Sequence, residues 1–124
     1  MKEEKTMADM LTELYEIVER RRAEREEGSY TAYLFDQGLD KILKKLGEEC
    51  GETIIAAKNL ERAQDRQRAE AEAALIGEMG DLIYHLTVLM AASELRPEAL
   101  EALLRERMAR TGNLKPQHGA DRNT

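Results

Sequence analysis

The stretches ECGE and EMGD, at residues 49–52 and 78–81, each carry two acidic side chains three positions apart. On a helix, residues at this spacing are neighbours on one surface. At about 100° per residue, each pair falls on the same side of the apolar stripe of its own helix. Two such helices packed side by side would bring four carboxylates to the edge of a low-dielectric core, where a cation would have to lie between them.

A cation in this place would be held by carboxylate oxygens alone. Ligand sets without histidine or cysteine select hard cations, so we expect Mg²⁺, with Mn²⁺ as the second choice. The matching geometry of the two pairs predicts a metal site made of Glu49, Glu52, Glu78 and Asp81. The alternative is a solvated helix face, which a single pair of acids on a highly charged helix usually forms.

Cationic side chains lie close to these acids along the chain. Lys41, Lys44 and Lys45 precede the first pair by one to two turns, and Lys58 and Asn59 follow it. Lys45 points to the same side as Glu49, and a metal with lysines on one face suits a polyphosphate substrate. The lysines could instead complete ion pairs with glutamates along the helix.

His85 comes one turn after Asp81 and also faces the acidic side, where it could donate to a phosphate. A hydrogen-bonded structural histidine is the alternative. Four glycines weaken the same two helices, each costing about 0.8–1.0 kcal/mol relative to alanine. Close approach of another helix or of a ligand would explain them; they are Gly47, Gly51, Gly77 and Gly80.

The segments that carry these residues are predicted to be helices. Apolar residues recur at helical spacing over about 8–26, 39–60 and 69–93, and Pro97 suits the first turn of a helix that ends near residue 110. GSYTAYLFDQG is expected to be a connector with at most one helical turn, and ERAQDRQRAEAE a loop or a solvated helix extension. No segment alternates with the period of a strand. The pattern predicts an all-α antiparallel helix bundle over 1–111, followed by a disordered tail over 112–124.

Composition limits the partners of the chain. Its 124 residues are 42% hydrophobic and 35% charged, with a net charge of −6, which disfavours binding to nucleic acid or anionic lipid. No apolar run reaches membrane-spanning length, so a cytoplasmic location is expected. The single cysteine, Cys50, excludes an internal disulfide and reads as a buried, inert thiol on the apolar face. Apolar positions off the main stripe of 69–93 indicate a homo-oligomer.

The acids also carry a resemblance to a known family. Glu48-Glu49-x-x-Glu52, followed by Glu78-x-x-Asp81, resembles the EExxE…ExxD signature of the all-α (MazG-like) nucleoside triphosphate pyrophosphohydrolases. The words SYTAYLFDQGLDKILKKLGEECGETIIAAKN and GEMGDLIYHLTVLM are similar to the phosphoribosyl-ATP pyrophosphatases of histidine biosynthesis. This likeness covers about residues 11–110, and the chain resembles the stand-alone form, without a cyclohydrolase domain.

The resemblance implies hydrolysis of 1-(5-phosphoribosyl)-ATP to 1-(5-phosphoribosyl)-AMP and pyrophosphate by a dimeric enzyme. It makes Glu49, Glu52, Glu78 and Asp81 the Mg²⁺ ligands and leaves Glu48 as a base or as a partner of a ligand. Contacts to phosphate or nucleotide would come from Lys45, Lys58, Asn59 and His85. Two alternatives stay open: a house-cleaning pyrophosphohydrolase of (d)NTPs, and a helical oligomerisation or regulatory module without catalysis.

Overall fold

The computed structural model describes residues 4–110, 114 and 115, and these contain helices and no strand, so the predicted all-α class is confirmed. The described chain forms helices α1 (Met7–Glu24), α2 (Tyr30–Gln37), α3 (Leu39–Arg62), α4 (Asp65–Ala92) and α5 (Pro97–Ala109). The predicted domain and tail boundaries stay predictions, because residues 111–113 and 116–124 lie outside the described part.

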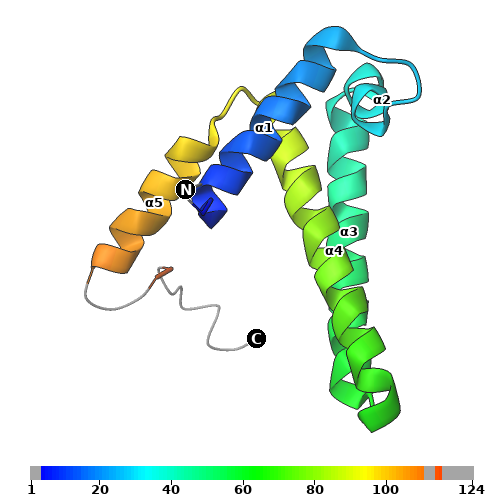
Figure 1. The fold of residues 1–124 in the computed structure, drawn as a ribbon. Coiled ribbons are helices and arrows are strands. Elements are labelled where there is room, and N and C mark those ends of the chain that lie inside the picture. The colour runs from blue at the N-terminus through cyan, green and yellow to red at the C-terminus, as the bar shows by residue number, and fades with distance from the viewer. Residues whose placement is uncertain (1–3, 111–113, 116–124) are drawn as a thin grey trace.

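Helices α3 and α4 form a long antiparallel hairpin that carries the rest of the chain (Figure 1). Helix α1 packs against the C-terminal half of α4, and α2 lies across the top of the hairpin beside the start of α3. Helix α5 lies beside α1, away from the hairpin. The turn end of the hairpin, drawn in green, extends below the other helices, so the described chain builds only part of a bundle.

The core of the chain lies where α1, α2 and the open end of the hairpin meet. Its fully buried members are Tyr15, Val18, Leu34, Ile42, Val88 and Ala91. Arg22 of α1 donates a hydrogen bond of 2.9 Å to the carbonyl of Ala91, one of the last carbonyls of α4. This bond satisfies a helix-end acceptor and fixes α1 to the end of α4.

Local signals explain where the helices begin. The Thr6 side chain accepts a hydrogen bond from the backbone N–H of Asp9, and the Asp9 carboxylate accepts one from Thr6, which is a capping box. Ser29 caps α2 in the same way, through the N–H of Ala32. Pro97 stands at the start of α5, as the sequence predicted.

Two connecting segments differ from the sequence prediction. GSYTAYLFDQG is not a connector: its centre forms the eight-residue helix α2, which ends at Gly38 with φ +92°. ERAQDRQRAEAE was predicted to be either a loop or a solvated helix extension. It is a helix extension, because α3 runs to Arg62 and α4 begins at Asp65. Only Ala63 and Gln64 separate the two long helices, and this short turn brings the two acidic segments onto facing helices.

The predicted apolar stripe of α3 is mostly exposed in this chain, and that of α4 is partly exposed. Ile54 of α3 is 65% exposed and Met79 of α4 is 47% exposed. Cys50, expected to be buried, is exposed as well, because it lies on this uncovered side of α3. We name as the apolar flank the exposed large hydrophobic residues on the two long helices outside the α3–α4 contact: Leu39, Leu43, Ile54, Ile76, Met79, Ile83 and Leu86.

The expectation that no apolar run reaches membrane-spanning length is wrong for α4, which is long and apolar enough to cross a membrane by length and composition alone. A core helix of a soluble protein passes the same test, so this property is weak support for a membrane span. The helix carries Glu78 and Asp81 near its middle, where charged groups are costly in lipid.

Candidate metal and substrate site

The acidic cluster lies between α3 and α4, about halfway along the hairpin. One carboxylate oxygen from each of Glu49, Glu52 and Glu78 lies within 4.8 Å of the other two. Glu49 is only 8% exposed, whereas Glu78 is half-buried and Glu52 is exposed. The two sequence motifs therefore do meet across the helix pair, and three of the four predicted ligands form one cluster.

The inner position of Glu49 is the main departure from the helical wheel. The wheel placed Glu49 beside the apolar stripe of α3, but the structure turns α3 so that Ile42, Glu49 and Ala56 are its buried residues. These three residues are seven positions apart, which is two helical turns, and together they line the contact with α4. The acid lies inside the helix pair, whereas the predicted stripe, apart from Ile42, lies outside it.

Two carboxylate oxygens in the cluster lack a partner. Glu49 Oε2 and Glu78 Oε2 are buried, and no described residue donates a hydrogen bond to either of them. Burial raises the pKa of Glu49, and the charges of Glu52 and Asp81 raise it further. Burial also raises the pKa of Glu78, as does its proximity to Glu52. Crowded, unpartnered oxygens at a buried position are what a hard cation would satisfy, so the residues fit Mg²⁺ or Mn²⁺.

Asp81, the fourth predicted ligand, lies outside the cluster. Its side chain is exposed, although its charge contributes to the raised pKa of Glu49, so it is close enough to act on the site. In this structure Asp81 therefore lies near the cluster without being one of its three grouped acids.

A threonine that sequence reasoning missed holds the two acidic segments together. The Thr53 hydroxyl donates to the backbone carbonyl of Glu49 at 2.8 Å and approaches the carbonyl of Glu78 at 3.5 Å. It thus links α3 to α4 at the level of the cluster. Its position one turn after Glu49, in a helix otherwise rich in longer side chains, was the only signal available in the sequence.

Lys45 lies one turn before Glu49, and its ammonium forms an ion pair of 2.9 Å with Glu48. The hydrogen bond from Lys45 lowers the pKa of the Glu48 carboxyl, and the charges of Lys45, Lys44 and Lys41 act in the same direction. Glu48 therefore stays ionised at neutral pH and is a weak proton acceptor. Its separation from the cluster agrees with the wheel, on which it pointed away from the core.

His85 is buried, and both of its ring nitrogens have partners. Nδ1 lies 2.7 Å from the carbonyl oxygen of Asp81, which can only accept, so Nδ1 carries a proton. Nε2 lies 3.0 Å from the Tyr30 hydroxyl. Tyr30, the first residue of α2, was missed as a neighbour of the site because its segment was read as a connector. Its own pKa is raised by burial.

The adjacent residues Lys58 and Asn59 lie in different surroundings. Lys58 is exposed and forms an ion pair of 2.7 Å with Glu61. Asn59 instead lines a cleft of about 230 Å³ whose walls include Glu52 and Glu78. We call this space the α3–α4 cleft. Asn59 shares it with two acids of the cluster, whereas Lys58 does not line it.

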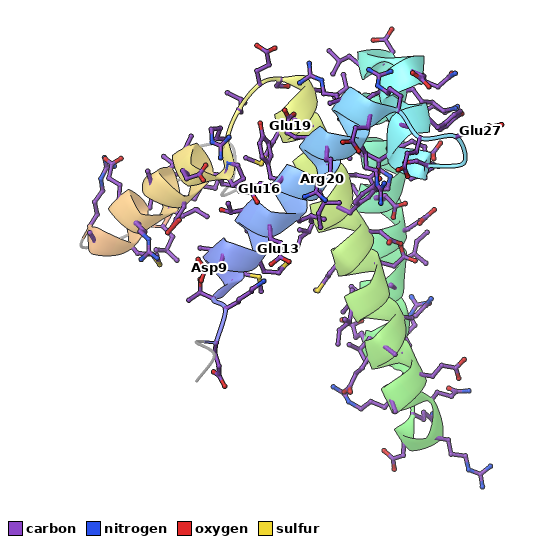
Figure 2. The ribbon with its side chains drawn as sticks, turned by 45° about the horizontal axis from the view of Figure 1, so that its top comes forward. Asp9, Glu13, Glu16, Glu19, Arg20 and Glu27 are labelled. Carbon is purple, nitrogen blue, oxygen red and sulfur yellow. The ribbon has the colours of Figure 1, made fainter. Side chains whose placement is uncertain are left out.

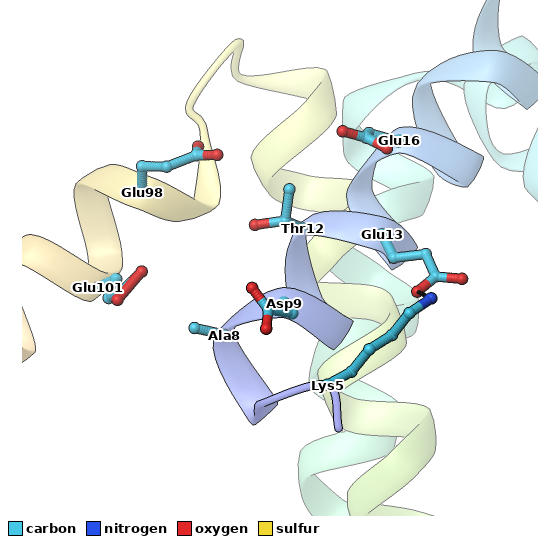
Figure 3. A pocket seen from close by; sticks show the side chains of 8 residues that line it. All are labelled: Lys5, Ala8, Asp9, Thr12, Glu13, Glu16, Glu98 and Glu101. Atoms are coloured by element: carbon cyan, nitrogen blue, oxygen red, sulfur yellow. Dashed lines mark hydrogen bonds and ion pairs between the residues drawn. The ribbon is translucent and has the colours of Figure 1, made fainter. Parts of the chain in front are cut away.

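A second hollow, of about 530 Å³, lies between α1 and α5 (Figure 3). Acidic side chains from both helices surround it, and Lys5, its one cationic neighbour among the lining residues, pairs with Glu13 at 2.6 Å. Figure 2 shows how Asp9, Glu13 and Glu16 follow one another along α1. Such a surface repels a polyphosphate, so its larger volume does not make it the substrate site.

Comparison with known proteins agrees with the acidic motif. The family model for phosphoribosyl-ATP pyrophosphohydrolase (PRA-PH) matches residues 11–108. A phosphoribosyl-ATP pyrophosphatase of Pelotomaculum thermopropionicum is 52% identical over 99 residues, which cover 80% of this chain and 91% of the relative. Proteins of the same name from Clostridium novyi and Listeria monocytogenes are 42% and 49% identical, over 88% and 79% of this chain and 90% and 84% of the relatives.

The match spans both acidic segments and the helices that carry them. It confirms the resemblance inferred from EExxE and ExxD, and it includes most of α1 and of α5. The chain belongs to the phosphoribosyl-ATP pyrophosphohydrolase family.

Proposed function

We propose that this chain hydrolyses 1-(5-phosphoribosyl)-ATP between its α and β phosphates, releasing 1-(5-phosphoribosyl)-AMP and pyrophosphate in the second step of histidine biosynthesis. Family membership supports the reaction, and the relatives named above carry the name of this activity. The observation that carries the proposal is the convergence of Glu49, Glu52 and Glu78, with two buried oxygens left unpartnered by the described residues.

The cofactor of this site is Mg²⁺, which Mn²⁺ can replace. Glu49, Glu52 and Glu78 would hold it, and Asp81, on the same turn of α4, completes the ligand set predicted from the sequence. A hard divalent ion supplies charge neutralisation at the phosphate oxygens and lowers the pKa of a bound water. This chain contributes the positions of the acids: Thr53 joins the two helices, and burial keeps Glu49 in one place.

In hydrolysis, a water oxygen forms a bond to a phosphorus of the α–β anhydride, the bridging P–O bond breaks, and the water proton passes to a base. Lys45 lies on the acidic side of α3 and neutralises phosphate charge. Glu48 and Glu49 are the two acids assigned to catalysis. The low pKa and the ion pair of Glu48 favour a role in holding Lys45 over a role as the base.

The remaining predicted contacts differ in how near they lie to the cluster. Asn59 lines the cleft next to it, whereas His85 contacts the Asp81 backbone from inside the helix pair. Lys58 would have to leave Glu61 to reach a phosphate. We therefore assign nucleotide contacts to Lys45 and Asn59 first, and to His85 and Lys58 second.

The working molecule is a homodimer or a higher homo-oligomer in the cytoplasm, without a nucleic-acid or membrane partner. The exposed apolar flank of α3 and α4 supports assembly, because it exposes seven large hydrophobic side chains on two long helices of one hairpin. The net charge of −6 supports the absence of nucleic-acid binding.

The decisive experiment measures pyrophosphate release from phosphoribosyl-ATP by the purified protein, with Mg²⁺ and with EDTA. We expect release with Mg²⁺ only. Hydrolysis of dCTP or dUTP with phosphoribosyl-ATP left intact would instead identify a house-cleaning pyrophosphohydrolase. No turnover of any of these substrates, with no change in melting temperature on adding Mg²⁺, would identify a helical module without catalysis.

A further inference from the structure

The α3–α4 cleft is continuous with the acidic cluster. Seven residues line it: Glu52, Ile55, Ala56, Asn59, Ala71, Ala74 and Glu78. Glu52 and Glu78 belong both to the cleft and to the cluster. With a volume of about 230 Å³ it is smaller than the pockets of about 300–1,000 Å³ that hold whole ligands. It therefore suits one part of a substrate whose reacting phosphates lie at the acids.

The walls of the cleft favour a flat group without negative charge. Four of the seven lining residues have hydrocarbon side chains, and three of these are alanines that leave the space between the helices open. Neither lysine nor arginine is among the lining residues, while two carboxylates stand at the end next to the cluster. A phosphate would meet uncompensated negative charge there, so the cleft excludes the anionic parts of a nucleotide.

Three of the five cationic residues of α3, Lys41, Lys44 and Lys45, lie on the other side of the acids, and the remaining two, Lys58 and Arg62, do not line the cleft. Lys45 precedes Glu49 by four residues, about 6 Å along the helix, and Asn59 follows Glu52 by seven residues, about 10 Å. Beyond Lys45, the Lys41 ammonium lies 5.9 Å from the ring centre of Tyr33. The acids thus separate Lys41 and Lys45 from a cleft whose lining residues include no cation, and an asymmetric substrate would lie across the acids in one direction.

The chemistry of phosphoribosyl-ATP matches this asymmetry. Its purine is the flat part that bears no phosphate of the triphosphate chain, and its N1 is occupied by the phosphoribosyl group. The edge formed by N7 and the exocyclic nitrogen at C6 remains free. An asparagine amide offers one donor and one acceptor and pairs with this edge of adenine. Asn59 supplies the one side-chain amide among the residues that line the cleft.

We propose that the α3–α4 cleft is the purine subsite of this enzyme, in which Asn59 reads the N6/N7 edge while the leaving pyrophosphate lies toward Lys45. The inference rests on the proposed function, since it takes the substrate from there. It adds the location of the base, the direction of the substrate and the residue that determines purine specificity.

The test compares AMP with 7-deaza-AMP, which lacks the N7 acceptor, by calorimetric titration in the presence of Mg²⁺. One hydrogen bond is worth about 0.5–1.5 kcal/mol, so the wild-type chain should bind 7-deaza-AMP about 2–12-fold more weakly than AMP. In Asn59→Ala the two ligands should bind equally. An unchanged AMP preference in Asn59→Ala would overturn the assignment of Asn59.

A second pair of variants tests the cleft itself. Ala74 and Ala73 are neighbours on α4 and both are exposed, but only Ala74 lines the cleft. Ala74→Leu should fill the space and weaken AMP binding about tenfold or more, with the affinity for inorganic pyrophosphate unchanged within about twofold. Ala73→Leu should change neither affinity. Helical circular dichroism and melting temperature establish that both variants fold.

The outcomes separate this inference from the proposed function. If Ala74→Leu leaves AMP binding intact, or weakens pyrophosphate binding equally, the cleft is not the purine subsite, whether or not phosphoribosyl-ATP is hydrolysed. If the wild-type chain binds AMP through the cleft but releases no pyrophosphate from phosphoribosyl-ATP, the proposed substrate fails and the purine subsite stands.

Discussion

Glu49 combines burial with negative charge, and this combination sets the chemistry of the site. Its side chain is 8% exposed, one of its oxygens has no described partner, and burial raises its pKa. A buried acid in this state disfavours the folded chain at neutral pH unless a cation is present. The stability of the protein and its metal binding should therefore be linked through this residue.

The first prediction concerns Glu49→Gln, which keeps the shape and removes the charge. If Glu49 is the metal ligand proposed above, turnover should fall more than about a hundredfold, because replacing a residue that only hydrogen-bonds to a metal ligand already lowers activity about 10–100-fold. Without Mg²⁺ at pH 7.5, the melting temperature of the variant should be higher than that of wild type, because the variant buries no charge. The expected rise is roughly 4 °C for each kcal/mol gained in the free energy of unfolding. Calorimetry with EDTA measures the shift, and a lower melting temperature would contradict the account of Glu49.

The pH dependence follows from the direction of the pKa shift. The pKa of Glu49 is higher in the folded chain than in the unfolded chain. The ionised carboxylate therefore destabilises the folded chain, and this destabilisation reaches its full size above the folded-state pKa. It is relieved as the pH falls through that value toward the ordinary value of about 4.3. The advantage of Glu49→Gln over wild type should therefore shrink between pH 7.5 and pH 4.5, and it should vanish at pH 7.5 when Mg²⁺ is added.

A second prediction separates the two roles open to Glu48. If the carboxylate holds Lys45, Glu48→Gln should raise KM and lower kcat only about tenfold or less, because the lysine is still present. Lys45→Met should weaken substrate binding in the same assay, and the double variant should be no worse than Lys45→Met. A loss in kcat matching that of Glu49→Gln, with KM unchanged, would make Glu48 the base instead.

The residue types and spacing of the site could be predicted from the sequence, but not which face of α3 is buried. The wheel assumed that the most apolar stripe faces inward, and it therefore placed Glu49 at the side. In the structure, Glu49 faces α4, and the apolar stripe that contains Ile54 is exposed. Periodicity identifies a face of a helix, but it cannot say whether that face meets its own chain or a second one.

At the scale of elements, Gly38 and Gly77 have opposite roles. Gly38 joins α2 to α3 with φ +92° and ψ −178°, a conformation nearly restricted to glycine. Gly77 lies within α4, and no described atom beyond its own neighbourhood lies within 4 Å of a Cβ added there. The predicted close approach at the helix glycines is thus absent within the described part of this chain.

The third prediction follows from this contrast. Gly38→Ala should destabilise the protein by about 1–3 kcal/mol, because alanine is strained at this backbone conformation. Gly77→Ala should stabilise it by about 0.8–1.0 kcal/mol through helix propensity alone. Urea denaturation measures the free energy of unfolding of each variant, which should be lower than wild type for Gly38→Ala and higher for Gly77→Ala. Destabilisation by Gly77→Ala would show that a second copy or another ligand packs against this position.

Long elements were easier to predict than short ones. Helices α3 and α4 carry several turns of periodic sequence, whereas the eight residues of α2 are too few to form a stable helix alone. Helix α2 is stabilised by tertiary contacts, such as the burial of Leu34 in the core and the Tyr30–His85 hydrogen bond. Such contacts depend on distant residues, so the local sequence read as a connector.

At the scale of the whole molecule, the apolar flank is a hydrophobic surface that the described chain leaves uncovered. It runs along α3 and α4 on residues that are 36% to 69% exposed. Burying one such side chain is worth about 1.5–3 kcal/mol, so a contact over several of them would hold two copies together. Assembly through this flank would cover the hairpin and complete the bundle.

The fourth prediction is that Ile54→Asp converts a dimer into a monomer. Light scattering coupled to size exclusion should show the mass of two chains for wild type and of one chain for the variant, since a carboxylate at the centre of an apolar contact is costly. Leu95→Asp is the matched control: Leu95 is 57% exposed but lies between α4 and α5, outside the flank. A monomeric wild type, or dissociation by Leu95→Asp alone, would contradict assembly through the flank.

The two-residue turn at Ala63 and Gln64 has a consequence for the order of folding. Contacts between segments near in sequence form faster than contacts between distant ones, so we expect the α3–α4 hairpin to pair before α1 and α5 dock. Glu49 and Glu78 then meet before the other helices dock, and we expect the repulsion between their carboxylates to slow the closing of the hairpin. Magnesium in a refolding buffer should shorten this aggregation-prone interval and raise the yield of native protein.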